Sequence, residues 1–264
     1  MLRAIDFHTH AFPDNLAQVA MEKLQHGQIP AYLDGRLSSL LGSMDKAGIY
    51  RCVVCNIATR PKQFDSIMRW CKEIASERVV PFASIHPEDP GWELRIDKVA
   101  EEGLKGIKLH PYYQGFVINE KRLLPIYRRI AKNGLLLIMH TGFDIAFPKD
   151  RIADPEKVIN VLNEVPDLRL ITTHLGAWDD WEEVDRHLIG KDVYMEISFS
   201  LEILNKATAE DLLLRHNPDY LLFGTDSPWT DQIAAIERFQ GLTLPDGLKE
   251  KTLFRNAERL LGID

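Results

Sequence analysis

Eight short runs rich in valine, isoleucine and leucine recur along this chain at nearly even spacing, and most segments between them have helical periodicity. The first and eighth runs end at His10 and Asp226, which are 216 residues apart. Each of the seven intervals therefore measures about 31 residues, as expected of a βαβ unit. The runs are AIDFHTH, RCVVCNIA, VVPFASIHP, GIKLHP, LLLIMHTG, LRLITTHLG, DVYMEIS and YLLFGTDSP.

The alternation predicts an α/β fold, a (β/α)8 TIM barrel formed by a single domain over residues 1–264. Strands that are apolar along their whole length are buried on both faces, which is typical of parallel strands covered by helices. A doubly wound open sheet is the alternative, but the first strand lacks the glycine-rich turn of a nucleotide-binding βα unit. With 264 residues, 45% of them hydrophobic, the chain can bury a large core.

The interval between the first two strands is the longest, and its periodicity predicts two helices, over residues 15–25 and 37–48. A single βα unit needs only one of them. We therefore expect the extra segment to form a lid over the mouth of the barrel, the end at which active sites lie.

Charge and hydropathy exclude several classes of partner. The formal net charge is −7 and no segment is strongly basic, so nucleic acid is not an expected partner. No apolar run approaches the length of about 18 residues that spans a bilayer, and the early position of His8 disfavours a removable signal peptide. We expect a cytoplasmic protein that acts on a small molecule, and a homo-oligomer is compatible with the sequence.

The three cysteines, Cys52, Cys55 and Cys71, predict no disulfide framework. Cys52 and Cys55 have C-x-x-C spacing, but they lie within a predicted strand, where a spacing of three directs them to opposite faces. We therefore interpret them as core residues.

Polar residues suited to catalysis collect at the predicted strand ends, where a barrel holds its active site. Six of the nine histidines lie there, and the eighth strand ends in an aspartate. These residues are His8, His10, His86, His110, His140, His174 and Asp226. His8 and His10 alternate along one strand, so both rings can point to one side while Phe7 and Thr9 face away. An isolated H-x-H pair is more often hydrogen-bonded within a core, but this constellation favours a metal site.

Four motifs in this order, HTH, MHTG, THLG and GTDSPW, resemble the amidohydrolase superfamily. The segments GIKLHPYYQGF and FGTDSPW are similar to its amidohydrolase-related branch, which includes aminocarboxymuconate-semialdehyde decarboxylase and lactone hydrolases. The resemblance covers essentially the whole chain. It implies that His8, His10, His140 and Asp226 hold one divalent metal, and this donor set suits Zn²⁺, with Mn²⁺, Fe²⁺ or Co²⁺ as alternatives.

The same resemblance implies that His174 acts as an acid/base group without binding the metal. The alternative is that His174 ligates a second metal. Asp226 is expected to serve twice, as a ligand and as the acceptor of a proton from the metal-activated water.

Lys108 and His110 point to the same face of the fourth strand. Binuclear members of the superfamily carry a carboxylated lysine or a glutamate on that strand, which bridges two metals. We favour one metal, with His110 either near the substrate or behind the metal ligands, and with Lys108 as a partly buried cation that pairs with an acid or with a substrate carboxylate. A second metal held by carboxylated Lys108 is the alternative.

Aromatic residues follow several strand ends, and we predict that Tyr112, Trp178 and Trp229 line the substrate pocket together with His110 and Lys108. The alternative is that these rings pack the loops against one another.

We predict a metal-dependent hydrolase that acts on a small lactone, amide or related carbonyl compound. The alternative is a metal-dependent, non-hydrolytic decarboxylase of a small unsaturated or aromatic acid, and a metal-binding scaffold without turnover is a third hypothesis. Decarboxylation needs a cation to hold the acid, and the loop after the histidine pair, AFPDNLAQ, offers none. The positions of Lys108, Lys149, Arg60 and Arg151 relative to the mouth decide whether another cation is available.

Overall fold

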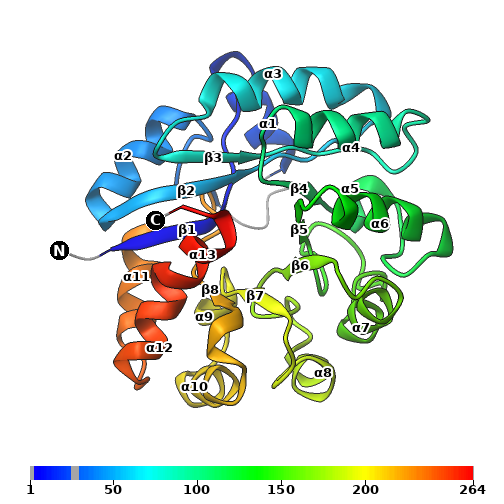
Figure 1. Cartoon of the computed structure of the whole chain (residues 1–264). Helices are drawn as coiled ribbons and strands as arrows, with labels where there is room; N and C mark the ends of the chain where they lie inside the picture. Colours follow the sequence, from blue (N-terminus) through cyan, green and yellow to red (C-terminus); the bar gives the residue numbers. More distant parts are fainter. Residues whose placement is uncertain (1–2, 25–29, 264) are drawn as a thin grey trace.

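The computed structural model describes residues 3–24 and 30–263, and eight parallel strands alternate with helices along it. The strands are β1 (Ala4–Thr9), β2 (Ile49–Cys55), β3 (Val79–Phe82), β4 (Gly106–Leu109), β5 (Leu136–Met139), β6 (Arg169–Thr172), β7 (Tyr194–Glu196) and β8 (Leu221–Leu222). The α-helices are α1 (Asp14–Leu24), α2 (Leu37–Ala47), α3 (Phe64–Ile74), α4 (Trp92–Glu101), α5 (Pro111–Gln114), α6 (Leu124–Lys132), α7 (Pro155–Glu164), α8 (Trp181–His187), α9 (Ser200–Ile203), α10 (Lys206–Arg215), α11 (Gln232–Gln240), α12 (Asp246–Glu250) and α13 (Asn256–Leu261). Figure 1 shows the strands at the centre and the helices around them.

The strands close into a ring. Regular pairing joins β1, β2 and β3 in one parallel sheet and β4 to β8 in another. Ala83, just after β3, pairs with Ile107 of β4, and Thr9 of β1 pairs with Ser227 after β8. The Phe7 amide also donates to the Phe223 carbonyl at 2.8 Å. These contacts connect both edges of the two sheets, so the predicted (β/α)8 barrel is confirmed, and the open sheet is not formed.

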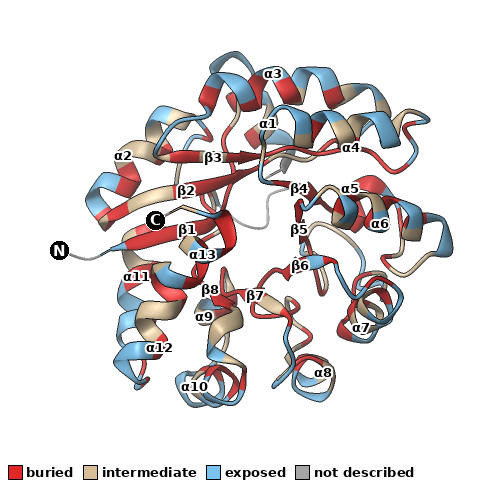
Figure 2. Ribbon diagram, viewed as in Figure 1, coloured by how far each residue is buried: buried red, intermediate tan, exposed pale blue. Residues whose placement is uncertain are grey.

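Buried side chains form two layers, one inside the barrel and one between the strands and the helices. Figure 2 shows strands that are buried over most of their length and helices whose outer faces are exposed. The inner layer includes Ile5, Phe7, Val53, Phe82, Leu136, Ile138, Ile171 and Leu222, and side chains of α13 pack against it. This burial of each strand on both faces explains the continuous apolar runs in the sequence.

Cys52 and Cys55 lie in different layers, as the strand alternation predicted. Cys52 belongs to the cluster under the helices and Cys55 to the cluster inside the barrel. Both are free and buried, as is Cys71. Their interpretation as core residues is therefore confirmed.

A β-bulge interrupts the alternation of β1. Asp6 is paired with Cys52 and Thr9 with Val54, so three steps along β1 match two along β2. The bulge allows Phe7 to pack inside the barrel, where its ring lies 6.1 Å from that of Phe82, while the next residue, His8, faces the cavity. The expectation that Phe7 faces away from the barrel interior is therefore wrong.

The two helices predicted before β2 are both present. They correspond to α1 and α2, and the predicted end of the first at residue 25 lies outside the described residues. α2 packs against β2 and α11 as a barrel helix, whereas α1 borders the cavity described below.

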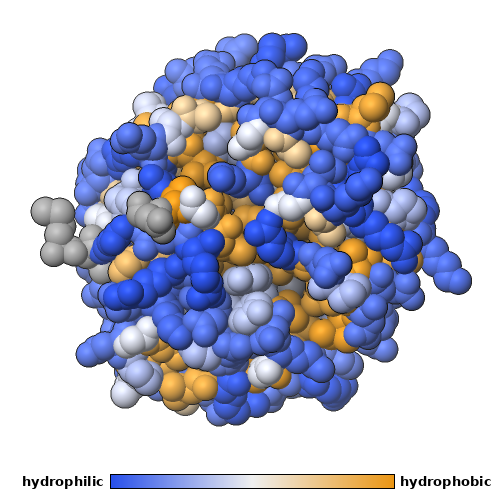
Figure 3. All heavy atoms as spheres, in the orientation of Figure 1, coloured by the Kyte–Doolittle hydropathy of each residue, from blue (hydrophilic) through white to orange (hydrophobic). Residues whose placement is uncertain are grey.

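Hydrophilic side chains cover most of the face seen in Figure 3, with smaller apolar patches between them. Among the residues that the structure describes, no helix has the length and apolar character required to cross a bilayer.

Candidate metal centre

A cavity of about 840 Å³ opens at the carboxyl ends of the strands. It brings together residues from β1, β4, β5, β6 and β8 that the sequence singled out. The predicted residues that line it are His8, His10, Lys108, His110, His140, His174, Trp178, Asp226 and Trp229. The cavity lies where a barrel holds its active site.

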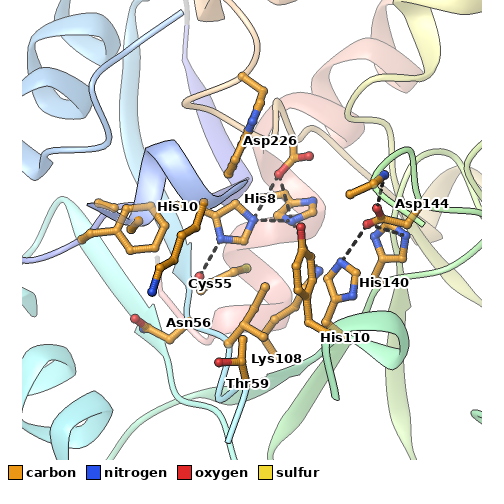
Figure 4. Close-up of a pocket in the computed structure, with 18 of the residues that line it drawn as sticks. His8, His10, Cys55, Asn56, Thr59, Lys108, His110, His140, Asp144 and Asp226 are labelled. Atoms are coloured by element: carbon orange, nitrogen blue, oxygen red, sulfur yellow. Dashed lines mark hydrogen bonds and ion pairs between the residues drawn. The ribbon is translucent and has the colours of Figure 1, made fainter. Parts of the chain in front are cut away.

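His8, His10 and Asp226 form a compact group in this cavity (Figure 4). The Nε2 atoms of the two histidines are 3.2 Å apart. Asp226 Oδ1 lies 3.4 Å from the Nε2 atom of His8 and 3.1 Å from that of His10. A tetrahedral cation with ligand distances of about 2.0–2.1 Å separates its ligands by about 3.3–3.4 Å. The three atoms are therefore spaced as ligands of one such ion.

The second nitrogen of each histidine is held by an acceptor outside the group. His8 Nδ1 lies 2.8 Å from Glu196 Oε1, and His10 Nδ1 lies 2.8 Å from the carbonyl oxygen of Cys55. A carbonyl or carboxylate oxygen only accepts, so each Nδ1 carries the hydrogen and each Nε2 presents its lone pair to Asp226. This arrangement, in which a second partner fixes the tautomer, is typical of metal-binding histidines.

The charge states also suit a cation. Burial lowers the pKa of His8 well below its ordinary value, and nearby Lys108 lowers it further, so His8 is neutral. Burial alone would raise the pKa of Asp226, but positive charge on the adjacent His8 and His10 rings outweighs it and holds that pKa below its usual range. A bound cation supplies the same positive charge when both rings are neutral, and neutral imidazole with an ionised carboxylate is the donor set that Zn²⁺ and related ions bind.

His140 lies in a neighbouring group with His110 and Asp144, outside the compact group. Its ring stacks on His110 with centroids 4.1 Å apart, and its Nε2 lies 3.0 Å from the Phe143 carbonyl oxygen. The Nε2 therefore carries the hydrogen, and Nδ1 is the atom with a free lone pair. The structure thus brings three of the four predicted ligands into direct contact.

His174 lies between His8 and His140, with ring centroids 5.6 Å and 5.0 Å away. Its Nδ1 lies 3.2 Å from the Ser198 carbonyl oxygen and so carries a hydrogen, which leaves Nε2 facing His140 Nδ1 at 3.3 Å. The lone pairs of His174 Nε2 and His140 Nδ1 therefore face each other, and their repulsion is relieved only by a proton on one ring or by a cation beside both.

His174 and Asp226 share an uncommon backbone conformation. Each has a φ of 59°, in the left-handed region that few residues other than glycine adopt. This conformation costs about 1–3 kcal/mol at a residue of this kind and occurs preferentially at functional sites. Both residues follow a strand end, so the turn directs their side chains into the cavity.

Lys108 is fully buried and reaches the ligand group. Its Nζ lies 3.3 Å from His8 Nε2, and burial lowers the pKa of the amine. The side chain is therefore placed either to contact a substrate or to bridge a second metal after carboxylation.

Two of the three predicted aromatic residues line the cavity. Trp178 does so beside Gly142, and the ring of Trp229 packs edge-on against His10 at 5.7 Å. Tyr112 does not line the cavity, because its hydroxyl donates to the carbonyl oxygens of Gly142 and Asp150 behind it. Tyr113, the next residue, lines the cavity instead.

Glu196 is a site residue that the sequence reasoning missed. One carboxylate oxygen accepts from His8 Nδ1 at 2.8 Å, from the Ser198 hydroxyl at 2.8 Å and from the His174 amide at 3.1 Å. Gly224 leaves room for it, because a Cβ there would lie 2.2 Å from the other carboxylate oxygen. The signal was present, because Glu196 is the last residue of an apolar strand, where the histidines were found.

Replacing Glu196 with glutamine is expected to weaken metal binding by about 10- to 100-fold, the usual effect of losing a partner that orients a ligand. The side-chain NH₂ group of glutamine donates where a carboxylate oxygen of Glu196 accepts, so glutamine cannot accept all the hydrogen bonds that Glu196 accepts. Competition with a chromophoric chelator measures the affinity. Glu183→Gln, which removes a surface partner of Arg186, is the matched control. Unchanged affinity in Glu196→Gln would show that this carboxylate does not orient His8.

Comparison with known proteins gives one family match, to a model described as Amidohydrolase that covers residues 5–263. No curated protein matches the chain.

Solved structures similar to this chain share its fold. An uncharacterized TIM-barrel protein from Bordetella bronchiseptica has a TM-score of 0.78 at 23% identity, with 99% of each chain covered. A candidate 2-pyrone-4,6-dicarboxylic acid hydrolase from Pseudomonas putida has a TM-score of 0.70 at 19% identity, covering 99% of this chain and 98% of that one. A 5-carboxyvanillate decarboxylase mutant from Novosphingobium aromaticivorans, with bound manganese, has a TM-score of 0.72 at 14% identity, covering 99% and 97%.

Proposed function

This chain belongs to the amidohydrolase family, and on that premise we propose that it is a metal-dependent hydrolase of a small lactone, amide or related carbonyl compound. The family match confirms the resemblance carried by the four sequence motifs. The more specific assignment, to hydrolysis, is a proposal based on the geometry of the site.

The observation that carries the proposal is the convergence of the His8 and His10 lone pairs on the ionised Asp226. We propose that these residues hold one divalent ion, with His140 as fourth ligand through Nδ1. Zn²⁺ fits this donor set, and Mn²⁺, Fe²⁺ or Co²⁺ would also be accepted. Such an ion lowers the pKa of a coordinated water and polarises a carbonyl oxygen.

The protein's own residues then handle the proton. Asp226 accepts a proton from the water that attacks the carbonyl carbon. His174, once Nε2 as well as Nδ1 carries a proton, donates from Nε2 to the carbonyl oxygen and stabilises the negative charge that develops there. The leaving oxygen or nitrogen takes the proton from Asp226 as its bond to carbon breaks, which yields an acid and an alcohol or amine.

Decarboxylation is the second candidate, and Lys108 favours it. Lys149 and Arg151 are paired with Asp179 and Asp180, and neither lines the cavity. Lys108 and Arg60, however, both line the cavity, and Lys108 lies at the ligand group, where it could hold a substrate carboxylate. Decarboxylases also occur among the proteins that share this fold.

Isotope labelling separates the two reactions. Metal-loaded enzyme is screened against lactones, amides and carboxylic acids, and any substrate found is turned over in ¹⁸O-labelled water. A hydrolase places the label in its product, and this is the result we expect. Release of CO₂ with no label in the organic product beyond background exchange would assign the protein as a decarboxylase.

A further inference from the structure

Helix α1 carries two apolar faces. Ala17 and Met21, one turn apart, are buried against the body of the protein. Leu16, Val19 and Ala20 have the i, i+3, i+4 spacing of a second face, and this face lines the cavity. Leu16 and Val19 are nevertheless 52% and 50% exposed. Two large apolar side chains therefore line the cavity while about half of their surface stays accessible.

Other elements contribute apolar side chains to the same cavity. Ile67 comes from α3, and Ile145, which is 39% exposed, comes from the loop after β5. The histidines and Asp226 line it from the strand ends. The cavity thus combines a polar ligand group with an apolar wall, and its volume of about 840 Å³ lies in the upper part of the range of about 300–1,000 Å³ for small-molecule sites.

We propose that Leu16, Val19, Ile67 and Ile145 form an apolar subsite, and that the substrate carries a hydrophobic alkyl or aryl substituent that fills it. The assignment of the reacting end of this substrate rests on the proposed function. The substituent would extend from the carbonyl compound at the ligand group toward α1. Burial of the half-exposed side chains supplies the binding energy, because apolar surface removed from water stabilises the complex.

The test measures binding without turnover. The probes are cyclopentanone and its 2-butyl and 2-octyl derivatives, which offer a carbonyl group but cannot be hydrolysed. Affinity is measured by isothermal titration calorimetry of the metal-loaded protein. Each additional methylene group in the probe is expected to raise the affinity about two- to fourfold. The fourfold figure corresponds to complete burial of the methylene, at about 0.8 kcal/mol. Affinity that does not depend on chain length would overturn the proposal.

Variants locate the effect on α1. The double variant Leu16→Ser/Val19→Ser is expected to lose at least half of the chain-length dependence while binding cyclopentanone as the wild type does. Leu94→Ser/Leu214→Ser is the control, because those side chains are 77% and 50% exposed but do not line the cavity. Single variants, checked by thermal melting, replace the double variant if it is unstable. If affinity depends on the chain length of the probe in the α1 variants as it does in the wild type, the assignment of the subsite to α1 is wrong.

A second copy of this chain is the competing occupant of the exposed face of α1. Sedimentation of the wild type and the double variant distinguishes it: a dimer that the double variant loses would overturn the subsite.

The experiments also distinguish a failure of the proposed subsite from a failure of the proposed reaction. If no lactone or amide is hydrolysed, the affinity series still reports on the subsite, whereas a flat series with hydrolysis intact rejects the subsite alone.

Discussion

Replacement of His10 by alanine is expected to remove the metal and, with it, the activity. Loss of a partner that only orients a ligand already costs about 10- to 100-fold in metal affinity, so loss of the ligand itself is expected to exceed 100-fold. Inductively coupled plasma mass spectrometry of the purified proteins measures the bound metal. We expect about one ion per wild-type chain and none retained by His10→Ala through gel filtration.

His140→Ala tests the fourth ligand in the same measurement. It is expected to lose the metal too, whereas His187→Ala, which changes a histidine paired with Glu183 on α8, keeps it. Metal retention by His140→Ala would limit the ligands to the compact group of His8, His10 and Asp226. A ratio near two ions per wild-type chain, with a carboxylated Lys108 in a crystal structure, would replace the one-metal assignment by a binuclear one.

Replacement of His174 is expected to reduce kcat/KM by about 10²- to 10⁴-fold while the metal stays bound, because the change removes an acid/base group and no ligand. His174→Asn is the more informative variant. Asparagine tolerates the left-handed backbone at this position better than alanine does, so a loss of rate in His174→Asn is not confused with the effect of a change in backbone strain. Activity and metal content are measured on the same preparation. If His174→Asn loses metal as readily as His10→Ala, His174 is a ligand.

Much of the fold was predictable because a barrel repeats one local pattern. Each strand is buried on both faces, so each strand appears in the sequence as a short apolar run, and helical periodicity marks the segments between. The positions of His8, His140 and Asp226 at one rim follow from that repetition, since all parallel strands end at the same side of the ring. Glu196 could have been found by the same reasoning.

Other features depend on interactions that local pattern does not contain. The bulge in β1 arises from pairing with both β2 and the segment after β8, and it places Phe7 and His8 on the interior side in succession. Whether Tyr112 or Tyr113 reaches the cavity depends on carbonyl oxygens 30 and 38 residues away, which accept from the Tyr112 hydroxyl. Periodicity alone cannot decide which of two adjacent tyrosines lines the cavity.

The sequence by itself determined which residue types stand at the rim of the barrel, because strand spacing and side-chain alternation are local properties. Only the tertiary structure decided which atoms of those residues face one another. The carbonyl oxygen of Cys55 on β2 holds the Nδ1 atom of His10, the residue after β1, and the carboxylate of Glu196 on β7 holds that of His8 within β1. A tautomer is set by its partner across the fold, so the donor atoms of a metal centre emerge only when the ring of strands has closed.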